Sequence, residues 1–182
     1  MVTFSHFYSQ MNESNSETEM GNTLKTQFVL SKIKYEVISE TDKTVKIVRN
    51  EDVDYFGNIV IPLTVHFITD FKVVEIEERA FEGCDKITSI QFPDTITIIG
   101  KCAFYKCTNL REIRLSNSMV EIPAFMCESC CSIEYIDIPY SVKHISGGAF
   151  LNCKNLKKVR IPYETIFEED RVFEKGVQIV RY

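Results

Sequence analysis

A unit of 23 residues repeats along the chain, and this period constrains the fold more than any other feature of the sequence. Equivalent positions keep one residue class through four successive units. The columns are Cys84, Cys107, Cys130 and Cys153; Ile87, Leu110, Ile133 and Leu156; Ile90, Ile113, Ile136 and Val159; and Phe92, Leu115, Ile138 and Ile161. A fixed period between about 20 and 50 residues is the signature of a solenoid, in which each unit stacks on the next.

Each unit is predicted to contain a short strand, a second extended segment and a compact turn. In "ITSIQFP", Ile90 and Phe92 alternate with polar residues as in a β-strand, and Pro93 opens a turn. The β-branched "TITIIG" indicates a second extended segment, and "KCAFYKC" a turn whose Phe and Cys point inward. Since one unit cannot bury its own apolar edge, at least ~3 must stack, which gives a parallel sheet with strands ~4.8 Å apart.

The ends of the repeat divide the chain into four parts. Residues 1–24 are predicted to be a flexible tail or linker, and 25–55 an N-terminal cap in which "KIKYEVI" and "KTVKIV" form a β-hairpin. Residues 56–162 hold one partial and four full units, with "LTVHFITDFKVVEI" as a hairpin or a longer first coil. Residues 163–182 lose the period, and their "VQIVRY" is predicted to form a final strand of a C-terminal cap that covers the open sheet edge.

The units "GAFLNCKNLKKVRIP" and "CAFYKCTNLREIRLS" resemble the BspA-type leucine-rich repeat, with its Ala-Phe-x-x-Cys turn followed by Leu-x-x-Ile-x-Ile-Pro. The resemblance covers about Phe56 to Pro162 and implies a β-rich leucine-rich-repeat solenoid. It also implies a role as a non-catalytic binding or adhesion module, since such proteins are mostly surface-attached or secreted in anaerobic bacteria and parasitic protozoa. Its implied partner is a protein or a host or matrix surface ligand of unknown identity. An intracellular scaffold of the same fold is the alternative.

Composition narrows these possibilities. The net charge of −5 provides no basic footprint for nucleic acid, and no apolar run approaches the ~18 residues of a membrane span. The first residues lack the basic and apolar regions of a secretory signal. Seven cysteines cannot all pair, which keeps a cytoplasmic location open beside the cell surface.

No motif in the sequence predicts catalysis, a cofactor or a metal site. Cys127-x-x-Cys130 is a lone pair, and His144 lies too far along the chain to complete a zinc site. The period explains the cysteine column as small inward side chains, so a thiol-dependent enzyme is a distant third hypothesis. Cys102 and Cys131 lie off the column and are candidates for exposed, reactive thiols.

The outward positions of the predicted strands vary from unit to unit, as expected for a binding surface in a repeat protein. The candidate binding residues on this face are Glu112, Arg114, Tyr135, Asp137, Lys158 and Arg160. Tyr135 is the preferred anchor, because exposed aromatic side chains often carry binding energy. The charges have a second explanation: Arg114, Asp137 and Arg160 alternate in sign on successive strands, so they are predicted to pair with one another.

The third unit departs from the repeat at its turn. Phe81, Phe104 and Phe150 share one column in which the third unit has Cys127, and Pro123 takes the place of Gly100. Interiors are close-packed, so a void of phenyl size is not expected to persist. We therefore predict a reshaped turn in which Phe125 or Met126 is buried as a substitute plug.

Overall fold

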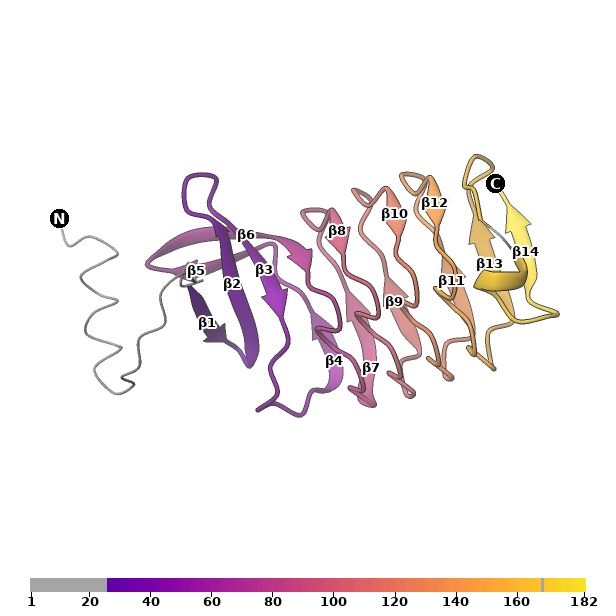
Figure 1. Cartoon of the computed structure of the whole chain (residues 1–182), viewed down its shortest axis with the longest axis horizontal. Helices are drawn as coiled ribbons and strands as arrows, with labels where there is room; N and C mark the ends of the chain where they lie inside the picture. The colour runs from indigo at the N-terminus through magenta and orange to yellow at the C-terminus, as the bar shows by residue number, and fades with distance from the viewer. Residues whose placement is uncertain (1–25, 168) are drawn as a thin grey trace, which may run out of the picture.

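Stacked coils of similar shape form most of the chain, and a curled sheet closes their N-terminal end (Figure 1). The computed structural model describes residues 26–167 and 169–182, so the tail predicted over 1–24 lies outside it. The described elements are β1 (Gln27–Leu30), β2 (Ile33–Ser39), β3 (Thr44–Val48), β4 (Phe56–Val60), β5 (Thr64–Phe67), β6 (Thr69–Ile76), β7 (Lys86–Gln91), β8 (Ile98–Ile99), β9 (Glu112–Arg114), β10 (Glu121–Ile122), β11 (Tyr135–Asp137), β12 (His144–Ile145), β13 (Lys158–Ile161), α2 (Glu169–Val172) and β14 (Gln178–Arg181).

The sheet at the N-terminal end has the order β1-β2-β3-β6-β5. Strands β2 and β3 pair antiparallel, with Tyr35 opposite Ile47, which confirms the predicted hairpin. The stretch after Pro62 is also a hairpin, since β5 and β6 pair antiparallel with Val65 opposite Phe71. Strand β6 then pairs parallel with both β3 and β8, and so joins this sheet to the coils.

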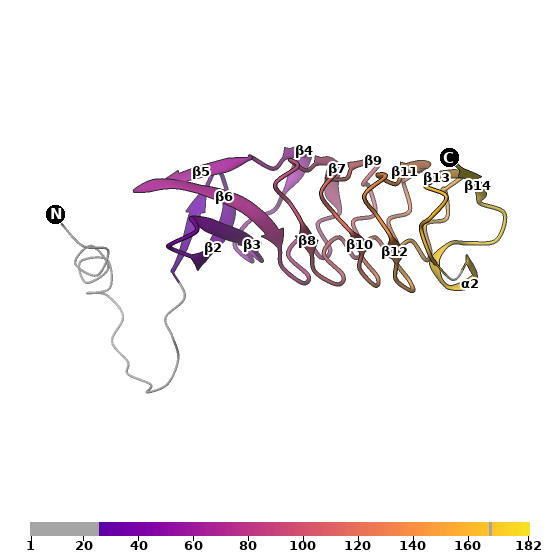
Figure 2. The same ribbon diagram turned by 90° about the horizontal axis from the view of Figure 1, so that it is seen from above.

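The coils place their strands along two sides of the molecule (Figure 2). On one side, β4-β7-β9 and β11-β13-β14 form two parallel three-stranded sheets. Their register pairs residues one repeat apart, such as Ile90 with Ile113 and Ile136 with Val159, as the columns predict. We name the exposed surface of these two sheets the strand face.

The predicted single sheet is interrupted between the second and third full units. Among the described residues, β9 and β11 form no ladder, and on the opposite side β8 and β10 do not pair. On that opposite side the cause is visible in the sequence. The amide of Gly100 donates to Ile76 O at 2.8 Å and that of Ser146 to Ile122 O at 2.9 Å, whereas Pro123 has no N–H to donate.

Aromatic rings stack through the centre of the coils. Phe81 and Phe104 are fully buried and nearly parallel, with ring centroids 5.4 Å apart. The rings of Phe150 and Phe173 repeat this arrangement at 5.7 Å. Phe173 lies one period after Phe150, and the amide of Phe150 donates to Val172 O, so the repeat continues beyond Pro162. The prediction that the period is lost there is wrong, although "VQIVRY" does form the final strand β14, parallel to β13.

The third turn keeps the geometry of its neighbours. Phe125 has a positive φ of 58°, as Cys102 does at 57° in the preceding turn, and the Cys127 amide still donates to Ala149 O at 2.8 Å. The predicted reshaping is therefore wrong. The predicted plug is confirmed for Met126, which is fully buried, while Phe125 is 42% exposed with its ring against Gly148.

Candidate binding surface

The six candidate residues all belong to β9, β11 and β13 on the strand face. Within each of these strands an outward side chain lies on either side of a buried one: Ile113 in β9, Ile136 in β11 and Val159 in β13. The register places Tyr135 beside Lys158 and Asp137 beside Arg160. The structure thus places four of the six in one ladder, while Glu112 and Arg114 lie on the neighbouring strand β9, which is not hydrogen-bonded to β11.

The charged side chains of this face largely pair with one another. Arg160 Nη1 lies 3.1 Å from Asp137 Oδ2, as the alternating signs predict. Arg114 instead pairs with Glu112, which lies two residues before it on the same face of β9, at 2.7 Å. These pairs are exposed, so water screens them and they contribute little to folding. Lys158 forms no ion pair with any described residue and is the cation of this group that remains available.

Arg160 is the centre of a small cluster with Tyr135, Asp137 and Tyr182, which we name the Arg160 cluster. The hydrogen bond to Tyr135, followed by the charge of Asp137, raises the pKa of Arg160 above its usual value. The Arg160 guanidinium also lies 4.5 Å from the centre of the Tyr182 ring. Tyr182 is itself fixed, since its hydroxyl donates to Ile138 O at 2.6 Å. The cluster therefore presents two aromatic rings around a guanidinium held from three sides.

Two further tyrosines extend this aromatic surface, and sequence reasoning missed them. Tyr140 and Tyr163 are 66% and 77% exposed, and each directly follows a repeat proline, so their common position in the unit was available as a signal. Lys143 lies 5.4 Å from the centre of the Tyr140 ring. Tyr182 was also missed, because its approach to β11 depends on how the last coil closes rather than on the period.

The cysteine column is part of the coil architecture. The thiols of Cys107, Cys130 and Cys153 each donate to a backbone carbonyl of the preceding coil at 3.1 Å. Burial raises the pKa of Cys153 to about 12. Since the thiolate is the nucleophile and the metal ligand, such a column is suited to neither role, which agrees with the structural explanation.

The cysteines off the column are less exposed than expected. Cys102 is half-buried, and burial raises its pKa. Cys131 is also half-buried, and its thiol donates to Ser129 O at 3.4 Å. Over residues 26–167 and 169–182, no three His, Cys, Asp or Glu side chains gather where a metal ion could be held. No helix in that part of the chain is long and apolar enough to cross a membrane.

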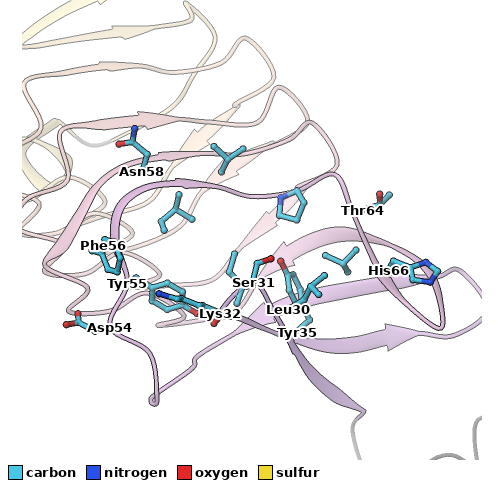
Figure 3. Close-up of a pocket in the computed structure, with 15 residues that line it drawn as sticks. Leu30, Ser31, Lys32, Tyr35, Asp54, Tyr55, Phe56, Asn58, Thr64 and His66 are labelled. Carbon is cyan, nitrogen blue, oxygen red and sulfur yellow. Dashed lines mark hydrogen bonds between the residues drawn. The ribbon is translucent and has the colours of Figure 1, made fainter.

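A pocket of about 400 Å³ opens where the N-terminal sheet meets the first coil (Figure 3). The β1–β2 turn, β4 and β5 form its walls, and Figure 3 shows Lys32 on the side of Tyr55 and Ser31 on the side of Leu30 and Tyr35. A smaller recess of about 200 Å³ lies across β4, β7 and β9 and reaches Glu112 and Arg114. Both recesses share Asn58, Ile59 and Val60. Sequence reasoning missed the pocket, because the position of the turn over β4 depends on the tertiary fold.

Comparison with known proteins gives a consistent result for the repeat. Residues 74–181 match the BspA type leucine-rich repeat region in 6 copies. The fold is similar to that of a leucine-rich cell surface protein from Faecalibacterium prausnitzii, with 25% identity, a TM-score of 0.74, and coverage of 85% of this chain and 39% of that one.

Two more solved structures are similar. A leucine-rich repeat protein from Bacteroides ovatus has 29% identity and a TM-score of 0.68 over 85% of this chain and 37% of the other. A leucine-rich repeat protein from Bacteroides capillosus has 26% identity and a TM-score of 0.64 over 73% of this chain and 96% of the other. The chain thus spans well under half of the first two proteins. No curated protein matches it significantly in sequence.

Proposed function

Because the chain belongs to the BspA-type leucine-rich-repeat family, we propose that it is a non-catalytic protein-binding module that recognises its ligand on the strand face. The observation that carries the proposal is the Arg160 cluster. Tyr and Arg are enriched among residues that dominate binding energy, and an aromatic ring beside a fixed guanidinium loses little freedom on binding. Tyr135, which is 44% exposed beside Arg160, is the proposed anchor of this cluster.

The ligand class that suits this surface is a folded protein or a matrix protein. The strand face offers aromatic area, internally paired charges and Lys158, which has no ion pair within the described part of the chain; this mixture is typical of protein interfaces. The F. prausnitzii protein of similar fold is a cell surface protein, which supports an adhesion role for this chain at a cell surface.

The second candidate function is that of an intracellular scaffold, and the cysteines favour it. All seven are free thiols, a state that reducing compartments maintain. Protease treatment of intact cells separates the two: loss of the chain before lysis supports the surface role, and full protection until lysis supports the scaffold.

The test of the strand face begins with a screen against matrix proteins and the proteome of the source organism. The affinity of each ligand is then measured for Tyr135→Ala, for Arg160→Ala and for the matched control Tyr105→Ala, whose tyrosine lies on the turn side. We expect the first two to weaken binding about tenfold or more, or ~1.4 kcal/mol, with Tyr105→Ala near wild type. Equal affinities for all three variants would remove the strand face as the binding site.

A further inference from the structure

Strand β4 has a hydrogen-bonding edge that no described strand occupies, since it is the last strand of the order β4-β7-β9. The Ile61 amide donates to Gln91 O at 3.0 Å, so Ile61 directs its backbone groups toward β7, and Ile59 does the same by the alternation of a strand. The amides and carbonyls of Asn58 and Val60 therefore point to the open side. A main chain placed there would meet a donor and an acceptor at each of these two residues.

The outward side chains of β4 leave this edge without protection. Its sequence, "FGNIV", contains neither a charge nor a proline, which usually shield an exposed edge from further pairing. Phe56 and Val60 are 64% and 66% exposed, whereas the residues in register with Val60, Gln91 and Arg114, are polar. The strand face thus becomes apolar at β4, and an unprotected apolar edge is a template for one more strand.

The pocket beside this edge has a fixed wall, the β1–β2 turn. The carbonyl of Lys32 accepts hydrogen bonds from Asn50 Nδ2 at 2.9 Å and from the Tyr55 hydroxyl at 3.1 Å. Ser31 and Lys32 both have positive φ, 50° and 72°, a conformation that residues other than glycine keep only when their surroundings hold it. The turn is therefore held in position independently of any ligand.

The shape of the pocket selects a single extended segment. Figure 3 shows Asn58 of β4 along one side of the pocket and Leu30 and Ser31 along the other. The buried side chains of Tyr35 and Val65 are among its lining residues, which gives it an apolar floor. Its volume of about 400 Å³, between strand and turn, suits one extended segment better than a whole coil or a second sheet.

The pocket has one charged lining residue without an opposite charge. Of its charged or titratable lining residues, Asp54 forms an ion pair with Lys86. His66 Nδ1 lies 2.8 Å from Asp70 Oδ1. Lys32 is exposed and forms no ion pair with any residue of 26–167 or 169–182. A carboxylate is therefore the charged group that complements this pocket.

We propose that this pocket binds an extended, carboxylate-bearing peptide segment of a partner protein, which adds to β4 as one more strand. The main chain of the segment bonds to Asn58 and Val60, and every second side chain packs on the apolar floor. An Asp or Glu side chain of the segment pairs with Lys32, whose Nζ lies 5.0 Å from the centre of the Phe56 ring. The site is distinct from the Arg160 cluster and does not depend on the ligand of that cluster.

The test selects a phage-displayed library of short linear peptides against the full chain. The affinity of each enriched peptide is measured by fluorescence anisotropy for the wild type, for Lys32→Glu and for the matched control Lys101→Glu. Both substitutions make the same charge change at an exposed residue, and Lys101 lies on the turn side. We expect an acidic peptide whose binding weakens about tenfold or more in Lys32→Glu, with Lys101→Glu near wild type. Failure to select any peptide with this sensitivity would overturn the proposal.

Two changes in the selected peptide test the ion pair and the strand pairing. Replacing its acidic residue by lysine should weaken binding to the wild type and restore binding to Lys32→Glu. Single N-methylation should lower affinity at every second residue, because only alternate residues of an added strand direct their amides toward β4. Equal effects of N-methylation at all positions would contradict the added strand.

Light scattering of the protein without peptide tests a different occupant of the edge. We expect no dimer that depends on Lys32. A dimer that dissociates in Lys32→Glu but persists in Lys101→Glu would assign the edge to a second copy of the chain, and this also overturns the proposal.

Discussion

Truncation of Phe104 to alanine tests the stacked core directly. Its ring is fully buried, nearly parallel to that of Phe81 at 5.4 Å, and 5.7 Å from that of Phe92. Removing a buried Phe costs about 3–5 kcal/mol, and each lost aromatic pair adds about 0.5–1.5 kcal/mol to the ordinary burial term. With two such pairs in contact, the upper part of that range is expected, near 5 kcal/mol.

Urea unfolding followed by far-ultraviolet circular dichroism measures this loss. The midpoint should fall strongly while the slope with denaturant stays close to that of the wild type, since the same surface is exposed on unfolding. Tyr163→Ala is the matched control, because its ring is 77% exposed, and its free energy of unfolding should lie within about 0.5 kcal/mol of the wild type. An unchanged midpoint for Phe104→Ala would refute the register in which one unit's Phe stacks on the next.

Three further predictions follow from local geometry. Gly100→Ala should destabilise the fold by roughly 3 kcal/mol in urea unfolding, because a Cβ at this position would lie 2.2 Å from a backbone nitrogen of the preceding coil. Gly147→Ala is the control and should be near neutral, because no atom lies within 4 Å of the Cβ that it would add. The hydrogen bond from Lys157 lowers the pKa of Glu134. The contribution of this pair to folding stability is therefore present near neutral pH and is lost as pH falls through that lowered pKa. NMR titration should show the pKa of Glu134 rising in Lys157→Ala. Cys107→Ala should cost about 1 kcal/mol by thermal melting, because it removes the thiol hydrogen bond to Phe81 O, which keeps only the Cys84 amide as a donor; a cost near zero would contradict the thiol hydrogen bond.

The repeat made most of the fold predictable. Because Ile90, Ile113 and their equivalents recur at one spacing and in one residue class, the register and the inward face followed from the sequence alone. The β2–β3 hairpin was also predictable, since its alternation is local, whereas for the stretch that forms β5 and β6 a hairpin was one of two alternatives. The candidate residues of β11 and β13 lie on one face for the same reason.

Features that depend on contacts between distant segments were not predictable. Arg114 pairs with Glu112 of its own strand rather than with Asp137, and β9 and β11 form no ladder among the described residues. The third turn keeps its backbone despite Pro123, because its hydrogen bonds run to the neighbouring turns rather than through the missing N–H. The pocket beside β4 likewise requires the β1–β2 turn to lie across the first coil.

Recognition through the strand face is the central claim, and a hydrogen-exchange footprint of the protein with its first identified ligand tests it most directly. Amide exchange is compared in the free and bound chain, with the residues of β11 and β13 as the expected site. The account predicts protection at Tyr135, Asp137 and Arg160 and no change on the turns that carry Cys102 and Cys131. Protection confined to those turns, with β11 and β13 unaffected, would contradict it.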